Sequence, residues 1–246
     1  ERIFCQCCGM PLDAPEDMGS NADGSPNRDY CRWCYQRGAF TAPEMDFLRS
    51  LSFAIVFVNS DQHNYEFDQI QVDFDQGLKQ MAVYLLDKKQ YRGIGYIGGV
   101  YEHGGVRIGG RRLSGLRRIL EERGLYDPTV FHVGDISRES GYTLARQAAR
   151  EGRLAEAMLL GSDEVAEGAL EAFRELGLRV PKDVAVIIYQ DIQTLESKWP
   201  TGTCIEMFPD YIWENALEIL FGRISQKRTQ AVTVVVPTHI RIGDTA

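Results

Sequence analysis

The sequence predicts an α/β fold with parallel sheets, preceded by a small cysteine-rich segment. From residue 53 onward, short apolar segments alternate with longer segments of helical periodicity, which is the pattern of repeated β-α units. Five of the six cysteines lie within the first 34 residues, so the two parts of the chain differ in kind. With 246 residues, 44% of them hydrophobic, the chain is long enough for one large domain or two ordinary ones.

Charge and hydropathy exclude several classes of protein. The chain has 27 Lys and Arg against 35 Asp and Glu, a net charge of −8, which disfavours non-specific binding to phosphate backbones. No apolar run reaches the ~18 residues that a membrane-spanning helix needs. The N-terminus has no signal-peptide pattern, so we expect no membrane association and a cytoplasmic location.

The N-terminal cysteines form two C-x2-C pairs. These are Cys5-Gln-Cys7-Cys8 and Cys31-Arg-Trp-Cys34, with 22 residues between the pairs. Zn²⁺ in structural sites takes four thiolate or imidazole ligands in a tetrahedron, and each C-x2-C turn supplies two. The spacing predicts a structural Zn²⁺ site formed by Cys5, Cys8, Cys31 and Cys34. Because so short a segment cannot bury enough apolar surface alone, the metal would supply its folding free energy.

Two alternatives stay open for these cysteines. Disulfides or unmodified thiols would also fit the count, although a cytoplasmic location disfavours disulfides. Cys7 lies inside the first pair and could replace one of its ligands. Cys204 lies in an apolar strand context, where we expect a core residue rather than a reactive thiol.

Residues 1–45 resemble a family of small bacterial zinc ribbons. The resemblance rests on the two cysteine pairs, on Gly9-Met-Pro-Leu12, and on glycines and aromatics at Gly19, Gly24, Tyr35, Gly38 and Phe40. It implies a fold and a bound zinc ion, and no activity. After it, Thr41-Ala-Pro-Glu44 has the pattern of a capping box, and Met45, Leu48 and Leu51 would share one helical face. We therefore expect a linker helix at 46–52.

The remaining sequence gives an ordered series of strands and helices. Strands are expected at 54–58, 70–72, 94–97, 130–133, 157–160, 184–189, 232–236 and 240–242. Helices are expected at 75–88, 108–123, 137–150, 162–176 and 211–225. Gly93-Ile-Gly95-Tyr-Ile-Gly98 matches the dinucleotide motif G-x-G-x-x-G, but its glycines alternate with strand residues instead of opening a helix. A dinucleotide site is therefore not expected there.

Residues 53–246 resemble the sugar-binding domain of LacI/GalR-type transcription regulators, which has a two-lobed, periplasmic-binding-protein-like fold. The motifs that carry the resemblance are Tyr91-Arg-Gly-Ile-Gly-Tyr-Ile-Gly-Gly99, Arg112-Leu-Ser-Gly115, Gly161-Ser-Asp163-Glu-Val-Ala-Glu-Gly168, Val180-Pro181-Lys-Asp183 and Tyr189-Gln-Asp191. It implies part of an N-terminal lobe at 53–124, a C-terminal lobe at 125–225 and closing strands at 226–246. Within the family, the sequence is most similar to galactoside-type repressors.

The resemblance also implies a function and partners. A regulator of this kind binds a small carbohydrate effector, such as a galactoside, and forms a homodimer. Two parts of the family pattern are absent: the helix-turn-helix, and the opening strands and helices of the N-terminal lobe. Direct DNA binding in the family's usual manner is therefore not expected from this chain.

Candidate effector contacts follow the ends of predicted strands, where ligands bind in open α/β sheets. Asp73, Ser162, Asp163, Gln190 and Asp191 directly follow such strands, and Arg112 heads a helix. By resemblance, Asp73, Arg112 and Gln190 match effector contacts, and Ser162 lies where a polar contact is common. Each has a structural alternative: Ser and Asp at a helix start are usually N-caps, and an arginine on an amphipathic helix is usually solvated. Asp163 and Asp191 match the motif but could equally serve the fold.

The sequence contains no recognisable catalytic constellation. His63, His103, His132 and His239 are scattered, and neither G-x-S-x-G nor H-E-x-x-H occurs. We expect that the protein is not an enzyme. The alternative to a sugar-responsive regulator is an interaction module, with a ribbon that contacts protein or nucleic acid and a non-sensing α/β scaffold. The acidic charge favours a protein partner for that module.

Overall fold

The computed structural model consists of two compact units, Glu1–Ala54 and Ile55–Ala246. It describes residues 3, 12, 14–32, 34–40, 54–59, 66–103, 106–190, 198–225 and 228–246. Several predicted features therefore lie outside the described residues: Cys5, Cys7, Cys8, Asp191 and the linker helix at 46–52.

The first unit contains two short antiparallel strand pairs. Its elements are η1 (Pro15–Asp17), β1 (Met18–Ser20), β2 (Pro26–Cys31), β3 (Tyr35–Gln36) and β4 (Ala39–Phe40), with β1 paired to β2 and β3 to β4. Cys31 and Cys34 are buried together with Leu12 in a small cluster. The backbone N–H of Cys34 donates to the carbonyl of Cys31 over 3.0 Å, which makes a tight turn between the two thiols. Cys31 and Cys34 thus belong to the buried apolar cluster among the described residues of this unit.

The second unit is built on a six-stranded sheet with the order β10-β7-β11-β12-β13-β15. Its strands are β7 (Ile94–Gly99), β10 (Phe131–Gly134), β11 (Ala157–Leu160), β12 (Ala185–Tyr189), β13 (Cys204–Glu206) and β15 (His239–Arg241). All neighbours are parallel except β13 and β15. The α/β class and the parallel sheet predicted from the sequence are confirmed.

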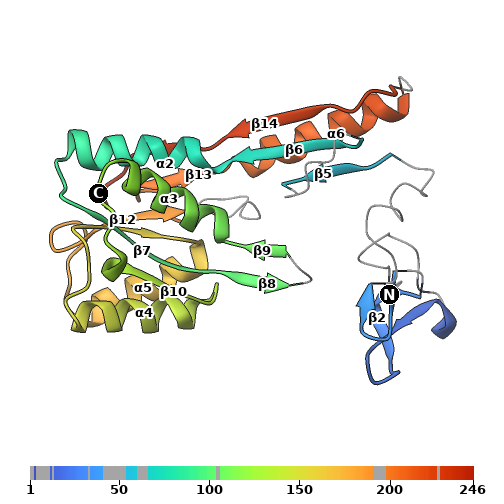
Figure 1. Ribbon diagram of the computed structural model, residues 1–246, viewed down its shortest axis with the longest axis horizontal. Helices are drawn as coiled ribbons and strands as arrows, with labels where there is room; N and C mark the ends of the chain where they lie inside the picture. The colour runs from blue at the N-terminus through green and yellow to red at the C-terminus, as the bar shows by residue number, and fades with distance from the viewer. Residues whose placement is uncertain are drawn as a thin grey trace. The chain divides into compact units, whose positions relative to one another are not determined.

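Helices cover both faces of this sheet (Figure 1). They are α2 (Phe74–Ala82) with its π-helical continuation η2 (Val83–Lys88), α3 (Gly110–Glu122), α4 (Arg138–Arg150) and α5 (Asp163–Glu175). Along β11, Ala157 and Leu159 pack into the core beneath α2 and α3, whereas Met158 and Leu160 pack into the core beneath α4 and α5. A strand buried on both faces has no polar side to alternate with, which explains the continuous apolar runs in the sequence.

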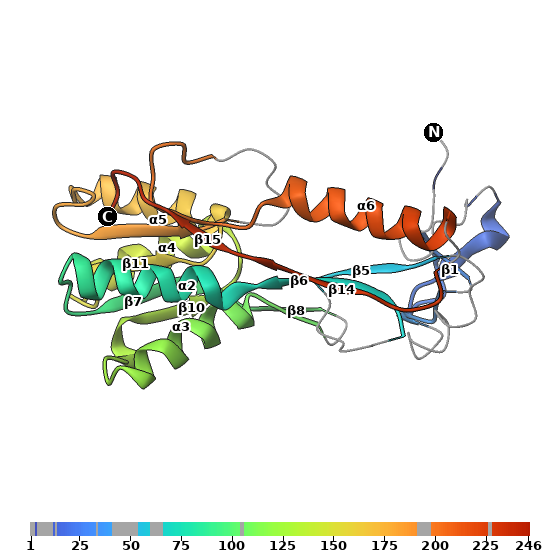
Figure 2. The same ribbon diagram turned by 90° about the horizontal axis from the view of Figure 1, so that it is seen from above.

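A smaller sheet of three parallel strands continues the unit. It consists of β5 (Val56–Val58), β6 (Asp68–Asp73) and β14 (Thr233–Pro237), in the order β14-β6-β5. Helix α6 (Pro209–Ser225) runs along this sheet and packs against β5 and β6 (Figure 2). The described residues also contain a hairpin of β8 (Tyr101–His103) and β9 (Val106–Ile108) and a short helix η3 (Pro128–Val130), none of which the sequence predicted.

The two sheets divide the chain differently from the predicted lobes. β7, assigned to the first lobe at 53–124, pairs with both β10 and β11 and so lies inside the six-stranded sheet. α6, assigned to the second lobe at 125–225, packs on the smaller sheet instead. The predicted lobes follow chain order, whereas strand pairing connects segments that are distant in sequence.

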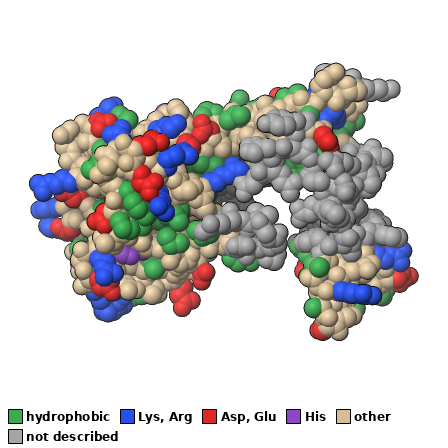
Figure 3. All heavy atoms as spheres, viewed as in Figure 1, with side chains coloured by type: hydrophobic (Ala, Val, Ile, Leu, Met, Phe, Trp, Pro, Cys, Tyr) green, Lys and Arg blue, Asp and Glu red, His purple; other side chains and the backbone are tan. Residues whose placement is uncertain are grey.

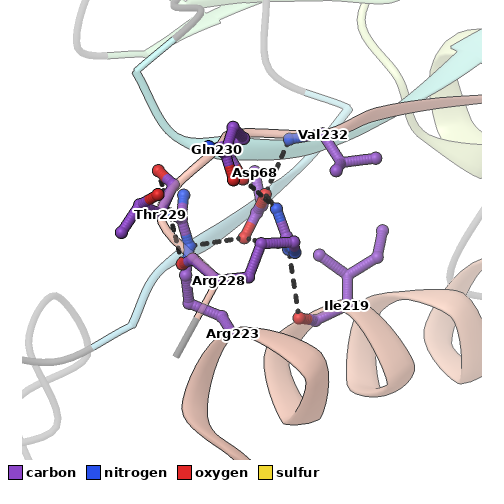
Figure 4. A network of polar contacts seen from close by, with 7 residues as sticks. All are labelled: Asp68, Ile219, Arg223, Arg228, Thr229, Gln230 and Val232. Atoms are coloured by element: carbon purple, nitrogen blue, oxygen red, sulfur yellow. Dashed lines mark hydrogen bonds and ion pairs between the residues drawn. The ribbon is translucent and has the colours of Figure 1, made fainter. Parts of the chain in front are cut away.

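A buried ion-pair network fastens α6 to β6 (Figure 4). The carboxylate of Asp68 is fully buried, and it accepts hydrogen bonds from Arg223, from both Nη atoms of Arg228 and from the backbone N–H of Val232. The network joins the start of β6, the end of α6 and the segment that enters β14. It therefore holds together the elements of the smaller sheet.

Three segments connect the smaller sheet to the larger one. β6 continues into α2 at Asp73, β13 leads into α6 through Phe208, and β14 continues into β15 through Thr238. Phe208 has a φ of 51°, in the left-handed region that non-glycine residues rarely adopt. No described helix is both long and apolar enough to cross a lipid bilayer.

Candidate functional site

Arg112 is buried at the carboxyl ends of three strands. Its guanidinium donates to the carbonyl of Gly161 after β11, its Nη2 lies 3.8 Å from the sulfur of Met207 after β13, and its Cζ lies 4.8 Å from the ring centre of Tyr189 at the end of β12. Only 9% of the residue is exposed. The solvated surface arginine considered from helical periodicity is therefore wrong, and the guanidinium is held where α/β sheets bind ligands.

Asp73 lies where β6 passes into α2. Its carboxylate caps the helix by accepting from the backbone N–H groups of Asp75, at 2.9 Å, and Gln76, at 3.2 Å. It also lines an open cavity of about 220 Å³. The lining residues are Val72, Asp73, Phe74, Asp75, Arg111, Ser114, Gly115 and Arg118. This cavity includes Asp73 but neither Arg112 nor Gln190.

Tyr189 connects these two predicted contacts, and the sequence prediction did not single it out. Its ring lies under Arg112 and 6.1 Å from the ring of Phe74, and its hydroxyl donates to the carbonyl of Phe74 over 3.0 Å. Burial raises the pKa of Tyr189 above its ordinary value, so the hydroxyl remains a neutral donor. The available signal was its position at the end of an apolar strand, directly before Gln190.

Ser162 and Asp163 have structural partners. The hydroxyl of Ser162 is fully buried and caps α5 by accepting from the N–H of Val165 at 3.2 Å. The carboxylate of Asp163 is also buried and accepts from the indole N–H of Trp199 at 3.1 Å. The N-cap interpretation of Ser162 is confirmed, and both side chains serve the fold in this conformation. Gln190 is buried directly after β12, at the carboxyl ends of the strands, and its backbone N–H donates to the carbonyl of Ile205.

Two of the four predicted zinc ligands can be placed. Cys31 and Cys34 are 0% and 4% exposed and are separated by a tight turn, which is the arrangement of a C-x2-C half-site for zinc. Among the described residues no group of three or more potential ligands gathers, since the other two predicted cysteines are not among them. Cys204 is buried in β13, where burial raises the pKa of its thiol to about 11, as expected for a core residue.

Surface charge agrees with the acidic composition. Figure 3 shows Lys and Arg side chains interspersed with Asp and Glu on the visible face of the second unit. On α3, Arg117 pairs with Glu121 at 2.7 Å, and Arg123, directly after this helix, pairs with Asp87 at 2.8 Å. Basic side chains of α3 are thus engaged by carboxylates rather than gathered for binding phosphates.

Two family models match the chain. Residues 83–246 match the "Periplasmic binding protein-like domain" and residues 4–84 match the "Putative zinc ribbon domain". Among curated proteins, the transcriptional repressor MelR of Bacillus subtilis is 29% identical over 193 residues, which cover 75% of this chain and 54% of MelR. The regulator GalR of Streptococcus thermophilus is 28% identical over 209 residues, which cover 84% of this chain and 61% of GalR.

Solved structures show the same fold. The regulator CelR in complex with cellobiose superposes with a TM-score of 0.63 at 25% identity, covering 78% of this chain and 58% of CelR. A regulatory protein of the LacI family from Chloroflexus aggregans gives a TM-score of 0.69 at 20% identity, covering 84% and 73% of the two chains.

The comparisons show how much of each relative the chain spans and to which family it belongs. The chain spans 54% of the length of MelR and 61% of the length of GalR. By their names the curated relatives are transcriptional regulators, which agrees with the expectation that this chain is not an enzyme. Because the first model covers two thirds of the chain, the protein belongs to the family of periplasmic binding protein-like domains, and the regulators GalR and CelR are among the proteins to which it is similar.

Proposed function

We propose that the second unit binds a small carbohydrate effector and acts as the sensing part of a LacI/GalR-type transcriptional regulator. The observation that carries the proposal is the burial of Arg112 at the carboxyl ends of β11, β12 and β13. The relatives support it: GalR is one of them, and CelR was solved with cellobiose. A galactoside is the effector that the sequence resemblance favours.

Three side chains would contact the sugar. Arg112 offers only hydrogen-bond donors, the carboxylate of Asp73 offers only acceptors, and the amide of Gln190 offers both. This set suits hydroxyl groups, which donate and accept. Asp191 remains a predicted contact beside Gln190. Ser162 and Asp163, predicted as contacts, would instead act from behind the site by fixing the start of α5 and Trp199.

Effector binding would change the angle between the two sheets. Only three segments join them, so a ligand that contacts Asp73 from the smaller sheet and Arg112 from the larger one would favour a closed arrangement. The regulator would act in the cytoplasm, where transcription regulators work. We assign no DNA contact to these 246 residues.

Replacement of Arg112 tests the effector site. A sugar at 100 times its dissociation constant stabilises a protein by about 2.7 kcal/mol. We expect Arg112→Ala, and the similarly sized Arg112→Met, to lose this sugar-dependent rise in melting temperature. Arg117→Ala, on the exposed side of the same helix, should keep it. Thermal unfolding of each variant with and without sugar makes the comparison internal, and an undiminished rise in both Arg112 variants would contradict the assignment.

We further propose that the chain forms a homodimer. The resemblance implies it, and α6 exposes several large apolar side chains, among them Leu217 at 56% and Phe221 at 67%. Sedimentation equilibrium should return twice the chain mass of 27.8 kDa. Leu217→Glu should shift the protein toward monomer, whereas Leu176→Glu at the end of α5 should not. The mass of a single chain for the unaltered protein would contradict the dimer.

The first unit would hold a structural zinc ion. We propose the division into a ribbon at 1–45, a linker helix at 46–52 and an effector-binding domain at 53–246. Cys5, Cys8, Cys31 and Cys34 would hold the metal, and the two buried thiols of the described pair fit its preference for sulfur. Zinc supplies folding free energy to the ribbon when it is bound.

A further inference from the structure

Two buried hydroxyl groups hold consecutive backbone carbonyls at one connection between the sheets. The hydroxyl of Tyr189 donates to the carbonyl of Phe74 over 3.0 Å, and the hydroxyl of Thr238 donates to the carbonyl of Asp73 over 2.7 Å. Tyr189 is 0% exposed and Thr238 is 1% exposed. Water cannot reach these groups, so the two hydroxyls are the side-chain partners of the two carbonyls. The carbonyl of Asp73 also accepts from the backbone N–H of Thr238, at 3.2 Å.

The hydroxyl pair joins parts of the chain that are far apart in sequence. Tyr189 and Phe74 are 115 residues apart, and Thr238 and Asp73 are 165 residues apart. Tyr189 ends β12 of the larger sheet, and Thr238 lies between β14 and β15. The two carbonyls belong to the last residue of β6 and the first residue of α2. The two hydrogen bonds therefore tie the β6–α2 connection to the β14–β15 connection and to the end of β12.

Packing around Thr238 leaves little room for adjustment. Its hydroxyl also accepts from the backbone N–H of Gly77 in α2, at 2.9 Å. A Cβ atom at Gly77 would overlap the side chains of Ile205 and Thr238, so α2 approaches this point as closely as its backbone allows. Such a contact region shifts between discrete arrangements rather than deforming gradually.

The same tyrosine supports both principal effector contacts. Its ring lies under the guanidinium of Arg112, while its hydroxyl holds the carbonyl of Phe74, one peptide beyond the Asp73 carbonyl that Thr238 holds. The carboxylate of Asp73 is in turn held by the first turn of α2. A shift of the Asp73–Phe74 peptide would therefore move the carboxylate relative to the guanidinium.

We propose that Tyr189 and Thr238 are positioning residues, which set the distance between the Asp73 carboxylate and the Arg112 guanidinium without touching the effector. The inference rests on the proposed function for the effector itself. The hydrogen bonds that carry it do not depend on that function. Two substitutions test the two residues separately. Tyr189→Phe keeps the ring under Arg112 and removes only the hydroxyl. Thr238→Val keeps the shape of the side chain and removes the two hydrogen bonds of the hydroxyl, while the backbone N–H still donates to the carbonyl of Asp73.

Affinity for the effector is the first readout. We expect Tyr189→Phe and Thr238→Val each to weaken sugar binding about 5- to 10-fold, the value of one buried hydrogen bond, in isothermal titration well below the melting temperature of each variant. Tyr142→Phe is the matched control, since it removes a tyrosine hydroxyl that donates to Glu175 on the surface of α4 and α5. A purely structural role would lower the melting temperature and leave the dissociation constant unchanged, which would overturn the proposal.

Amide hydrogen exchange is the second readout, and it needs no sugar. The backbone N–H groups of Asp75, Gln76 and Gly77 should exchange about 5- to 10-fold faster in Tyr189→Phe than in the unaltered protein or in Tyr142→Phe. If the unaltered protein binds none of the sugars tested, the proposed function fails and the exchange rates alone decide the inference. Exchange at these three amides that is the same in all variants would overturn it.

Discussion

Replacing Asp68 by alanine is expected to lower the free energy of unfolding of the second unit by about 3–5 kcal/mol. The substitution leaves the guanidinium groups of Arg223 and Arg228 without the carboxylate that both contact at 2.9 Å. These side chains are only 18% and 21% exposed, so water replaces the lost partner poorly. The N–H of Val232 also loses its acceptor, which loosens the entry to β14.

Urea unfolding at neutral pH measures this effect, and Asp87→Ala is the matched control. Asp87 also pairs with an arginine, but its side chain is 52% exposed, so we expect little change there. A loss for Asp68→Ala no larger than that for Asp87→Ala would contradict a structural role for the network.

The network also predicts a dependence on pH. Burial by itself would raise the pKa of Asp68, but hydrogen bonds from Arg228 and Val232 and the charges of Arg223 and Arg228 outweigh it, so the pKa lies below its ordinary value. A lowered pKa in the folded state contributes stability above the unfolded value of about 3.9, and this stability is lost as the pH falls further. Stability should therefore fall between about pH 4 and pH 2 less steeply in Asp68→Asn than in the unaltered protein.

Replacing Cys31 by serine is expected to reduce bound zinc from one ion per chain to none and to unfold the first unit. Structural zinc sites contribute about 10–16 kcal/mol of apparent binding free energy in small domains, more than a unit of this size gains from its apolar core. Elemental analysis gives the stoichiometry, and NMR signals of the first unit report its folding.

Cys204→Ser is the control for the zinc experiment. It alters a buried thiol of the second unit, so it should keep one zinc ion per chain while costing stability in β13. One zinc ion retained in Cys31→Ser would remove Cys31 from the ligand set and indicate that Cys7 completes the site.

Local pattern was enough to predict most elements of the α/β unit. The apolar runs at 157–160 and 184–189 became β11 and β12, and the glycine-interrupted run after Gly93 became β7 rather than a dinucleotide loop. Ser137 and Ser162 cap α4 and α5 as serine at a helix start usually does. The lobe boundaries could not be predicted in the same way, because β7 joins the larger sheet through partners that lie 30 or more residues away.

In the site, too, local sequence motifs identified some residues, whereas contacts between distant residues could not be predicted. Asp73 and Arg112 were identified through family motifs. The helical spacing of α3 agrees for Arg112, which lies four and seven residues before the buried Leu116 and Ile119, but spacing alone does not show what the guanidinium contacts. The role of Tyr189 depends on contacts to Phe74 and Arg112, 115 and 77 residues away, which only the folded chain brings together. Ser162 and Asp163 match the same motifs, but their partners within and beyond α5 engage both side chains in the fold.

A thermal-shift screen of the zinc-loaded protein against mono- and disaccharides, including galactosides and cellobiose, tests whether the second unit senses a sugar. We expect one cooperative transition whose melting temperature rises with one class of sugar, in proportion to the logarithm of the sugar concentration above the dissociation constant. A cooperative transition that no sugar moves would contradict the sensing role and favour an interaction module in which the α/β unit serves only as a scaffold.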